Sequence, residues 1–115
     1  MFNEICVYEA KLDKQEEIET LMREVAEFYS AQPGVLEVRY IKRTHRQEDF
    51  NSVKAGKPPI RLTRYVGKAT YMLYLVLESA EAHGNLATAA FEKFYKRWNR
   101  CLVSMPKIYL GENIV

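Results

Sequence analysis

The stretch "YSAQPGVLEVRYIK", Tyr29 to Lys42, contains the change of pattern that decides the fold. Before Pro33 the apolar residues recur every three or four positions, and after Gly34 they alternate. Proline cannot continue a helix, and glycine tolerates the turn that must follow one. We therefore predict a helix that ends before Pro33 and a strand that begins at Val35.

The flanking segments extend this pattern. Phe2 to Leu12 is rich in β-branched and aromatic residues and predicts a strand. Asp13 to Gln32 predicts an amphipathic helix, with Asp13 as N-cap and Glu16 in the capping-box position. Val35 to Arg43 alternates as a second strand. The apolar stripe of the helix consists of Ile18, Leu21, Met22, Val25, Phe28 and Tyr29.

The second half of the chain repeats the order strand, helix, strand. Ala69 to Ser79 has apolar residues on both faces, so it predicts a central strand that is covered on both sides. A second helix is expected from about Ala80 to Leu102, with an early interruption at Gly84 in the form of a bend or a two-piece start. Pro106 suits the beginning of an edge strand. The residues available for that last strand are Ile108, Leu110, Ile114 and Val115.

The order β-α-β-β-α-β predicts an α+β, ferredoxin-like fold, in which two helices cover one face of a four-stranded antiparallel sheet. The 115 residues form one domain, 1–115, with a basic inserted arm at about 44–68. An uncovered apolar sheet face is an association site, so we expect a homodimer, sheet against sheet. Depending on register, that face carries either Ile5 and Val7 or Tyr71, Leu73, Leu75 and Leu77.

Composition and charge exclude several classes of protein. Seventeen basic and fifteen acidic residues give a net charge of +2, which alone indicates neither nucleic acid nor a membrane surface. No run approaches the ~18 apolar residues of a membrane span, and the N-terminus lacks a signal-peptide pattern. Cys6 and Cys101 have neither zinc-ligand spacing nor a disulfide framework. We therefore expect a cytoplasmic protein with free thiols and no membrane partner.

Two short motifs carry a resemblance to a known family. Pro33-Gly34-Val35-Leu36 joins a helix to a strand, and Glu78-Ser79-Ala80-Glu81-Ala82 joins a strand to an aromatic amphipathic helix. Together with their flanks, Phe2 to Lys42 and Ala69 to about Ile108, they resemble the antibiotic-biosynthesis-monooxygenase-like (ABM) family of dimeric α+β barrel proteins. The resemblance implies a dimeric barrel in which the arm is an insertion.

The resemblance implies two alternative functions. The family includes cofactor-free oxygenases for aromatic polyketides or quinols, haem-degrading enzymes, and proteins with no known reaction. One implied function is a cofactor-independent monooxygenase, with no cofactor or metal, acting on a small aromatic or quinol-type substrate. The other is a non-catalytic dimeric protein that binds a hydrophobic or anionic small ligand. Clustered tyrosines favour the first. Leu77, where many members have tryptophan, favours the second.

Other departures from the family pattern count against haem degradation. The haem-degrading members have an asparagine on the first strand, where this chain reads Val7-Tyr8-Glu9. Their helical histidine has no counterpart, because His83 lies several residues too early.

An oxygenase of this kind must help an electron-rich ring lose a proton and must stabilise the resulting anion. Tyr40 and His45 are the candidate catalytic residues. His45 lies among Lys42, Arg43 and Arg46, cations that favour its neutral form, which can act as a base. The candidate substrate-binding residues are Tyr8, Tyr74, Trp98 and Arg39. The three aromatic residues also have a structural interpretation, since aromatic side chains pack well on strands and in helix cores. Arg39 would need a partner such as Glu37 or Glu9 if its face forms the dimer interface.

The arm from Thr44 to Lys68 carries six basic residues and an interleaved aromatic, Tyr65, as nucleic-acid-binding segments do. Glu48 and Asp49 interrupt it, and no stacking platform accompanies it, which argues against nucleic acid. Three other roles remain open for the arm: closing over the pocket, wrapping a partner, or steering an anionic substrate.

Overall fold

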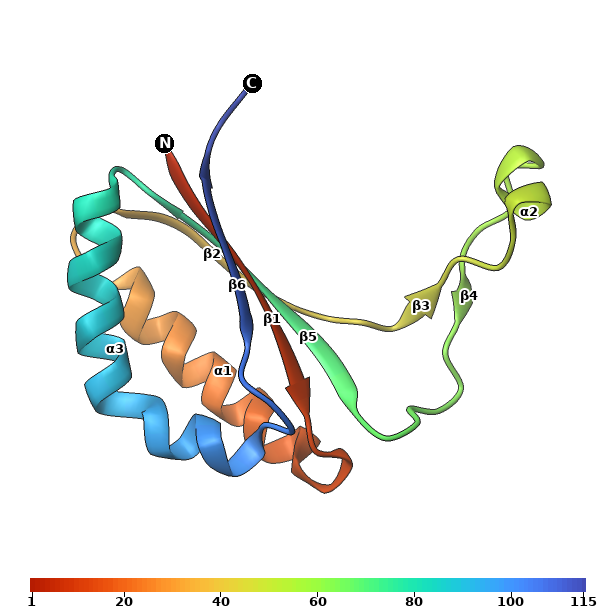
Figure 1. Cartoon of the computed structure of the whole chain (residues 1–115), viewed down its shortest axis with the longest axis horizontal. Coiled ribbons are helices and arrows are strands. Elements are labelled where there is room, and N and C mark those ends of the chain that lie inside the picture. The colour runs from red at the N-terminus through yellow and green to blue at the C-terminus, as the bar shows by residue number, and fades with distance from the viewer.

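The computed structural model describes all residues 1–115 and shows a four-stranded antiparallel sheet with strand order β2-β5-β1-β6. Two long helices cover one face of this sheet, as Figure 1 shows. The predicted ferredoxin-like α+β fold is thereby confirmed. The strands are β1 (Phe2–Ala10), β2 (Val35–Lys42), β5 (Ala69–Leu77) and β6 (Lys107–Glu112), and the long helices are α1 (Gln15–Ser30) and α3 (Ala80–Cys101).

The central position of β5 agrees with its apolar sequence. It pairs antiparallel with β1 along its whole length, from Ala10 opposite Ala69 to Phe2 opposite Leu77. On its other side it pairs with β2. Its alternate side chains, which pack under the helices, are all buried: Tyr71, Leu73, Leu75 and Leu77.

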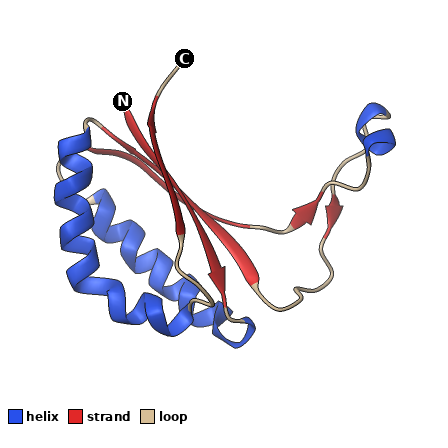
Figure 2. Ribbon diagram, viewed as in Figure 1, coloured by secondary structure: helices blue, strands red, loops and turns tan.

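The opposite face of the sheet has no covering element (Figure 2). The register decides between the two sets of residues left open above, and Ile5 and Val7 are the ones that lie on this face. The prediction that β5 is covered on both sides was therefore wrong for the single chain. Ile5 and Ile41 are each 47% exposed, so this face presents apolar side chains that are open to contact.

Three predicted details at element ends were wrong. Asp13 does not cap α1, because Leu12–Lys14 forms a 3-10 turn and the helix begins at Gln15 without a side-chain cap. Gly84 causes no interruption, since α3 runs continuously from Ala80. Ile114 and Val115 lie beyond the last strand, because β6 pairs with β1 and β1 begins at Phe2, opposite Glu112.

The two motifs that carried the resemblance contact each other. The Glu78 amide donates to the Gly34 carbonyl at 2.8 Å, and Ser79 caps α3 by accepting from the Ala82 amide at 3.1 Å. Gly34 has a φ of +81°, in the left-handed region, and a Cβ placed there would lie 2.8 Å from the Ala82 Cβ. The turn before β2 is thus packed on the first turn of α3.

Residues 44–68 project from the sheet as an arm (Figure 1). In the arm β3 (His45–Arg46) pairs with β4 (Ile60–Arg61), and a short helix, α2 (Phe50–Lys54), forms the tip. The Asp49 side chain caps α2 by accepting from the Ser52 amide at 2.7 Å. An extended arm was expected here from the sequence, but α2 was not.

Candidate functional site

Three of the residues predicted from the sequence meet between the sheet and the helices. The Tyr8 ring of β1 stacks on the Trp98 ring of α3, with centroids 4.7 Å apart. The Tyr40 ring of β2 lies 6.1 Å from Tyr8 and 6.3 Å from Trp98. Because both tyrosines occupy helix-facing positions of their strands, the register brings them to one aromatic cluster.

The structure does not bring the other three predicted residues to this cluster. His45 lies in the arm, exposed, with its Nδ1 2.8 Å from the Thr44 hydroxyl. Arg39 and Tyr74 are directly opposite each other in the register of β2 and β5, on the helix-free face. Arg39 pairs there with Glu37, Nε to Oε1 at 2.6 Å. The thickness of the sheet separates Arg39 and Tyr74 from Tyr40.

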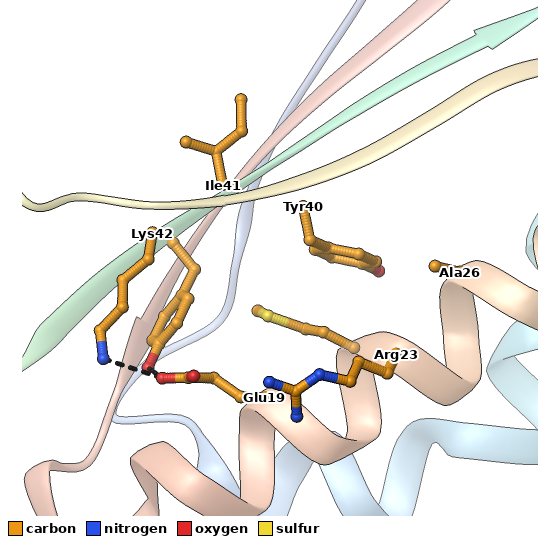
Figure 3. Close-up of a pocket in the computed structure, with 8 residues that line it drawn as sticks. Glu19, Arg23, Ala26, Tyr40, Ile41 and Lys42 are labelled. Carbon is orange, nitrogen blue, oxygen red and sulfur yellow. Dashed lines mark hydrogen bonds and ion pairs between the residues drawn. The ribbon is translucent and has the colours of Figure 1, made fainter.

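A cavity of about 220 Å³ opens beside the cluster, between α1 and β2 (Figure 3). Tyr40 lines this cavity and also belongs to the aromatic cluster, so the cavity and the cluster are adjacent. Figure 3 shows Tyr40 and Lys42 pointing toward α1 and Ile41 pointing away from it. The other lining residues are Glu19, Met22, Arg23, Ala26 and Tyr71.

A charged group forms one end of the cavity. The Glu19 Oε2 accepts hydrogen bonds from Lys42 Nζ at 2.8 Å and from the Tyr71 hydroxyl at 2.7 Å. Burial raises the pKa of Glu19, but these hydrogen bonds more than offset that effect and bring its pKa below its ordinary value. Burial, and then the bond to Glu19, raises the pKa of Tyr71. At neutral pH the end of the cavity therefore holds a carboxylate, an ammonium and a neutral phenol.

The Tyr40 hydroxyl is buried and has no hydrogen-bond partner in the protein. In Figure 3 it points toward α1, near Ala26. Burial, followed by the neighbouring Tyr29, raises the pKa of Tyr40 well above its ordinary value. The hydroxyl consequently keeps its proton at neutral pH, so it is suited to donate a hydrogen bond and not to act as a base.

Sequence reasoning missed the polar groups of this site, and a second polar pair outside it, because their partners are distant in the chain. Glu19 and Tyr71 are 52 residues apart. His83 Nε2 lies 2.5 Å from Glu4 Oε1, with 16% and 11% of the two side chains exposed, and these residues are 79 apart. One signal was available, since Glu4 occupies the same strand face as the buried Cys6. An acidic residue at such a position requires a partner.

Replacing Glu19 with glutamine is expected to remove part of the acid sensitivity of folding. The folded pKa of Glu19 lies below the ordinary value of 4.5. Its contribution to stability is therefore complete above pH ~4.5 and is lost as the pH falls through the folded pKa. Urea unfolding of both proteins from about pH 7 down to about pH 3 tests this, because the stability difference should shrink on acidification. A difference that does not vary with pH would contradict it.

Both cysteines are buried and unbonded. No helix of the protein combines the length and apolarity that crossing a membrane requires. No group of three or more histidine, cysteine, aspartate or glutamate side chains is placed to hold a metal ion.

The fold has relatives among solved structures. A Nitrosomonas europaea protein named a candidate antibiotic biosynthesis monooxygenase superimposes with a TM-score of 0.71 at 14% identity, covering 100% of both chains. A mutant of a cofactor-independent oxygenase from Streptomyces nogalater gives 0.65 at 12% identity, covering 99% of this chain and 94% of that one. A protein of unknown function from Nitrosomonas europaea gives 0.62 at 11% identity, covering 99% and 89%.

These similarities establish an ABM-like fold and do not establish an activity, since identities of this size leave the site residues free to differ. No protein-family profile matches the sequence, and no curated protein is significantly similar to it.

Proposed function

We propose that this protein is a cofactor-independent oxygenase for small electron-rich phenols or hydroquinones, which bind in the cavity at Tyr40. The observation that carries the proposal is the buried Tyr40 hydroxyl, a donor without a partner. Leaving such a group unsatisfied costs about 1–3 kcal/mol. A phenol oxygen of a bound substrate would accept this hydrogen bond and remove the cost.

The size and charge of the cavity support this class of substrate. About 220 Å³ is less than the ~300–1,000 Å³ of sites that enclose drug-sized ligands, which favours one or two rings. Met22 and the Tyr40 ring offer apolar contact to such a ring, while Lys42 and Arg23 together outweigh Glu19 and leave the cavity with a net positive charge. These cations would stabilise a phenolate relative to the neutral phenol.

The proposed reaction needs no electron donor other than the substrate. The phenol releases its hydroxyl proton to solvent, and the phenolate passes an electron to O2. The two radicals combine at a ring carbon that carries a hydrogen, forming a C–O bond, and the peroxide anion takes up a proton from solvent. Loss of water from this hydroperoxide, which removes the ring hydrogen and breaks the O–O bond, leaves a quinone. One oxygen atom of O2 enters the quinone and the other leaves as water. Tyr40, Lys42 and Arg23 would orient the phenolate and stabilise its charge.

We also propose that the protein is a homodimer joined through the helix-free face of the sheet. The support is the exposed apolar surface of that face, to which Ile5, Ile41 and Tyr109 contribute. A contiguous apolar surface on a sheet is a common site of association, and a two-fold axis would bring two such faces together.

The proposed activity has one further support, which is the fold that this chain shares with a cofactor-independent oxygenase.

Tyr40→Phe is expected to lower kcat/KM for the best phenol by about 10–100-fold, the worth of one hydrogen bond to a charged oxygen. Oxygen uptake with a panel of one- and two-ring phenols and hydroquinones measures this. Tyr74→Phe is the matched control, since it removes a tyrosine hydroxyl from the opposite face of the sheet and should leave the rate unchanged.

Other results of this experiment would change the proposal. Thermal stabilisation by the same phenols, lost in Tyr40→Phe but without oxygen uptake, would support the alternative of a non-catalytic binding protein. The absence of both uptake and stabilisation across the panel would contradict the assignment of the cavity.

A further inference from the structure

The arm, residues 44–68, is held to the rest of the chain at its root, where Tyr65 packs against the core and Lys68 pairs with Glu9. Its β3 and β4 contact each other but make no extensive contact with the sheet or the long helices. Its internal support includes the Leu62 amide bonded to the Thr44 carbonyl at 2.8 Å and, at its root, the Tyr65 hydroxyl bonded to the Arg43 carbonyl at 2.7 Å. An isolated two-stranded hairpin is marginally stable at best in water. Beyond its root the arm therefore gains little stability from its own chain.

The tip of the arm presents apolar side chains to solvent. Phe50 and Val53 of α2 are 74% and 49% exposed, and Val66 nearer the root is 78% exposed. In α2, Lys54 Nζ lies 5.5 Å from the centre of the Phe50 ring, so charge and apolar surface are presented together. Exposed aromatic side chains such as Phe50 are typical of the anchors of protein–protein interfaces.

The charge of the arm is opposite to that of the rest of the molecule. Residues 44–68 hold six basic and two acidic side chains, whereas the remaining residues hold eleven basic and thirteen acidic ones. The arm therefore has a net charge of +4 and the body a net charge of −2. A second copy of the body has a net charge of the opposite sign, which favours its approach to the arm.

The direction of the arm fits the same partner. In Figure 1 the arm leaves the end of the sheet and turns toward the side that carries neither α1 nor α3. This is the side on which Ile5 and Ile41 are exposed. A molecule docked on the open face of the sheet would therefore lie within the space that the sheet and the arm enclose.

We propose that the arm is a clasp for a second copy of this chain. With two sheets face to face, the α2 helix of each copy packs Phe50 and Val53 onto the body of the other, and the basic residues of the arm lie against that body, whose net charge is negative. This inference rests on the homodimer proposed above. Nucleic acid fits less well, because the tip is apolar and Glu48 and Asp49 lie beside it.

Phe50→Asp tests the clasp, and Phe91→Asp is its matched control. Both phenylalanines are exposed, by 74% and 65%, so neither substitution should alter the folded monomer. Phe91 lies on α3, on the other side of the sheet. Sedimentation equilibrium should show a dimer dissociation constant raised by about tenfold or more for Phe50→Asp and unchanged for Phe91→Asp. Added salt should weaken the wild-type dimer, because the clasp includes opposite charges.

A third variant, Ile5→Asp on the open face, separates the clasp from the dimer. If Ile5→Asp abolishes the dimer and Phe50→Asp leaves the dissociation constant unchanged, the proposed dimer through the open face is supported and the clasp is overturned. If the wild-type protein is a monomer at all concentrations measured, both proposals are overturned. If a short DNA duplex binds the arm while Phe50→Asp leaves dimerisation unchanged, the clasp is likewise overturned and nucleic acid takes its place.

Discussion

Gly34→Ala is expected to lower the free energy of unfolding by about 2–5 kcal/mol, the largest loss we expect from a single added methyl group. Two costs combine. An L-residue at φ = +81° costs about 1–2 kcal/mol relative to glycine. The new Cβ would also lie 2.8 Å from the Ala82 Cβ, and relieving such an overlap typically costs about 1–3 kcal/mol. Urea unfolding followed by circular dichroism measures the sum.

Two further variants separate these costs. Gly67 has a φ of +76°, and no atom lies within 4 Å of the position that an added methyl group would take, so Gly67→Ala should show the backbone cost alone. Gly34→Ala combined with Ala82→Gly removes the overlap, and it should be more stable than the sum of the two single changes predicts. If Gly34→Ala and Gly67→Ala lower the free energy of unfolding equally, the overlap with Ala82 of α3 adds nothing to the cost of the Gly34 substitution.

His83→Leu is expected to destabilise the protein by about 2–4 kcal/mol, somewhat less than removal of one partner from a fully buried pair. The substitution leaves the Glu4 carboxylate, only 11% exposed, without the ring nitrogen that lies 2.5 Å from it. A charged or polar group that is buried without a partner retains its desolvation cost and loses its compensation. Urea unfolding at neutral pH gives the difference.

A double-mutant cycle supplies the control for this pair. Glu4→Leu combined with His83→Leu replaces both polar groups at once, and it should cost less than the two single changes added together. Lys14→Ala breaks the exposed ion pair between Lys14 and Glu17, 3.3 Å apart, and should change stability by less than about 1 kcal/mol. Additive losses in the cycle would show that Glu4 and His83 act independently.

The elements of the fold were predictable because their signals are local. The change of apolar period around Pro33 and Gly34, and the doubly apolar segment Ala69 to Ser79, each lie within a few residues of the structure that they specify. The wrong predictions concerned positions where the conformation of adjacent residues overrides a local sequence signal. Asp13 has the chemistry of an N-cap, but the chain turns through a 3-10 segment before α1 can begin.

The candidate site was only partly predictable. The alternation of β1 and β2 was sufficient to direct Tyr8 and Tyr40 toward the helices, and to direct Arg39 to the face opposite Tyr40. It could not show that Tyr74 shares the face of Arg39, because that depends on how β5 pairs with β2. Nor could it exclude His45, which is close to Tyr40 in sequence but belongs to the projecting arm.

By itself the sequence determined the kinds of element, their order, the turn at Gly34 and the apolar stripe of each helix, because backbone preferences and side-chain periodicity act over a few residues. Only the tertiary structure decided which polar groups meet in the cavity and elsewhere in the interior. Lys42 and Tyr71 meet Glu19, and Glu4 meets His83, because strand order and register bring together residues that are 23 to 79 positions apart. Local sequence patterns do not specify those pairings, because the pairs form only when the sheet and its helices pack together around a common interior.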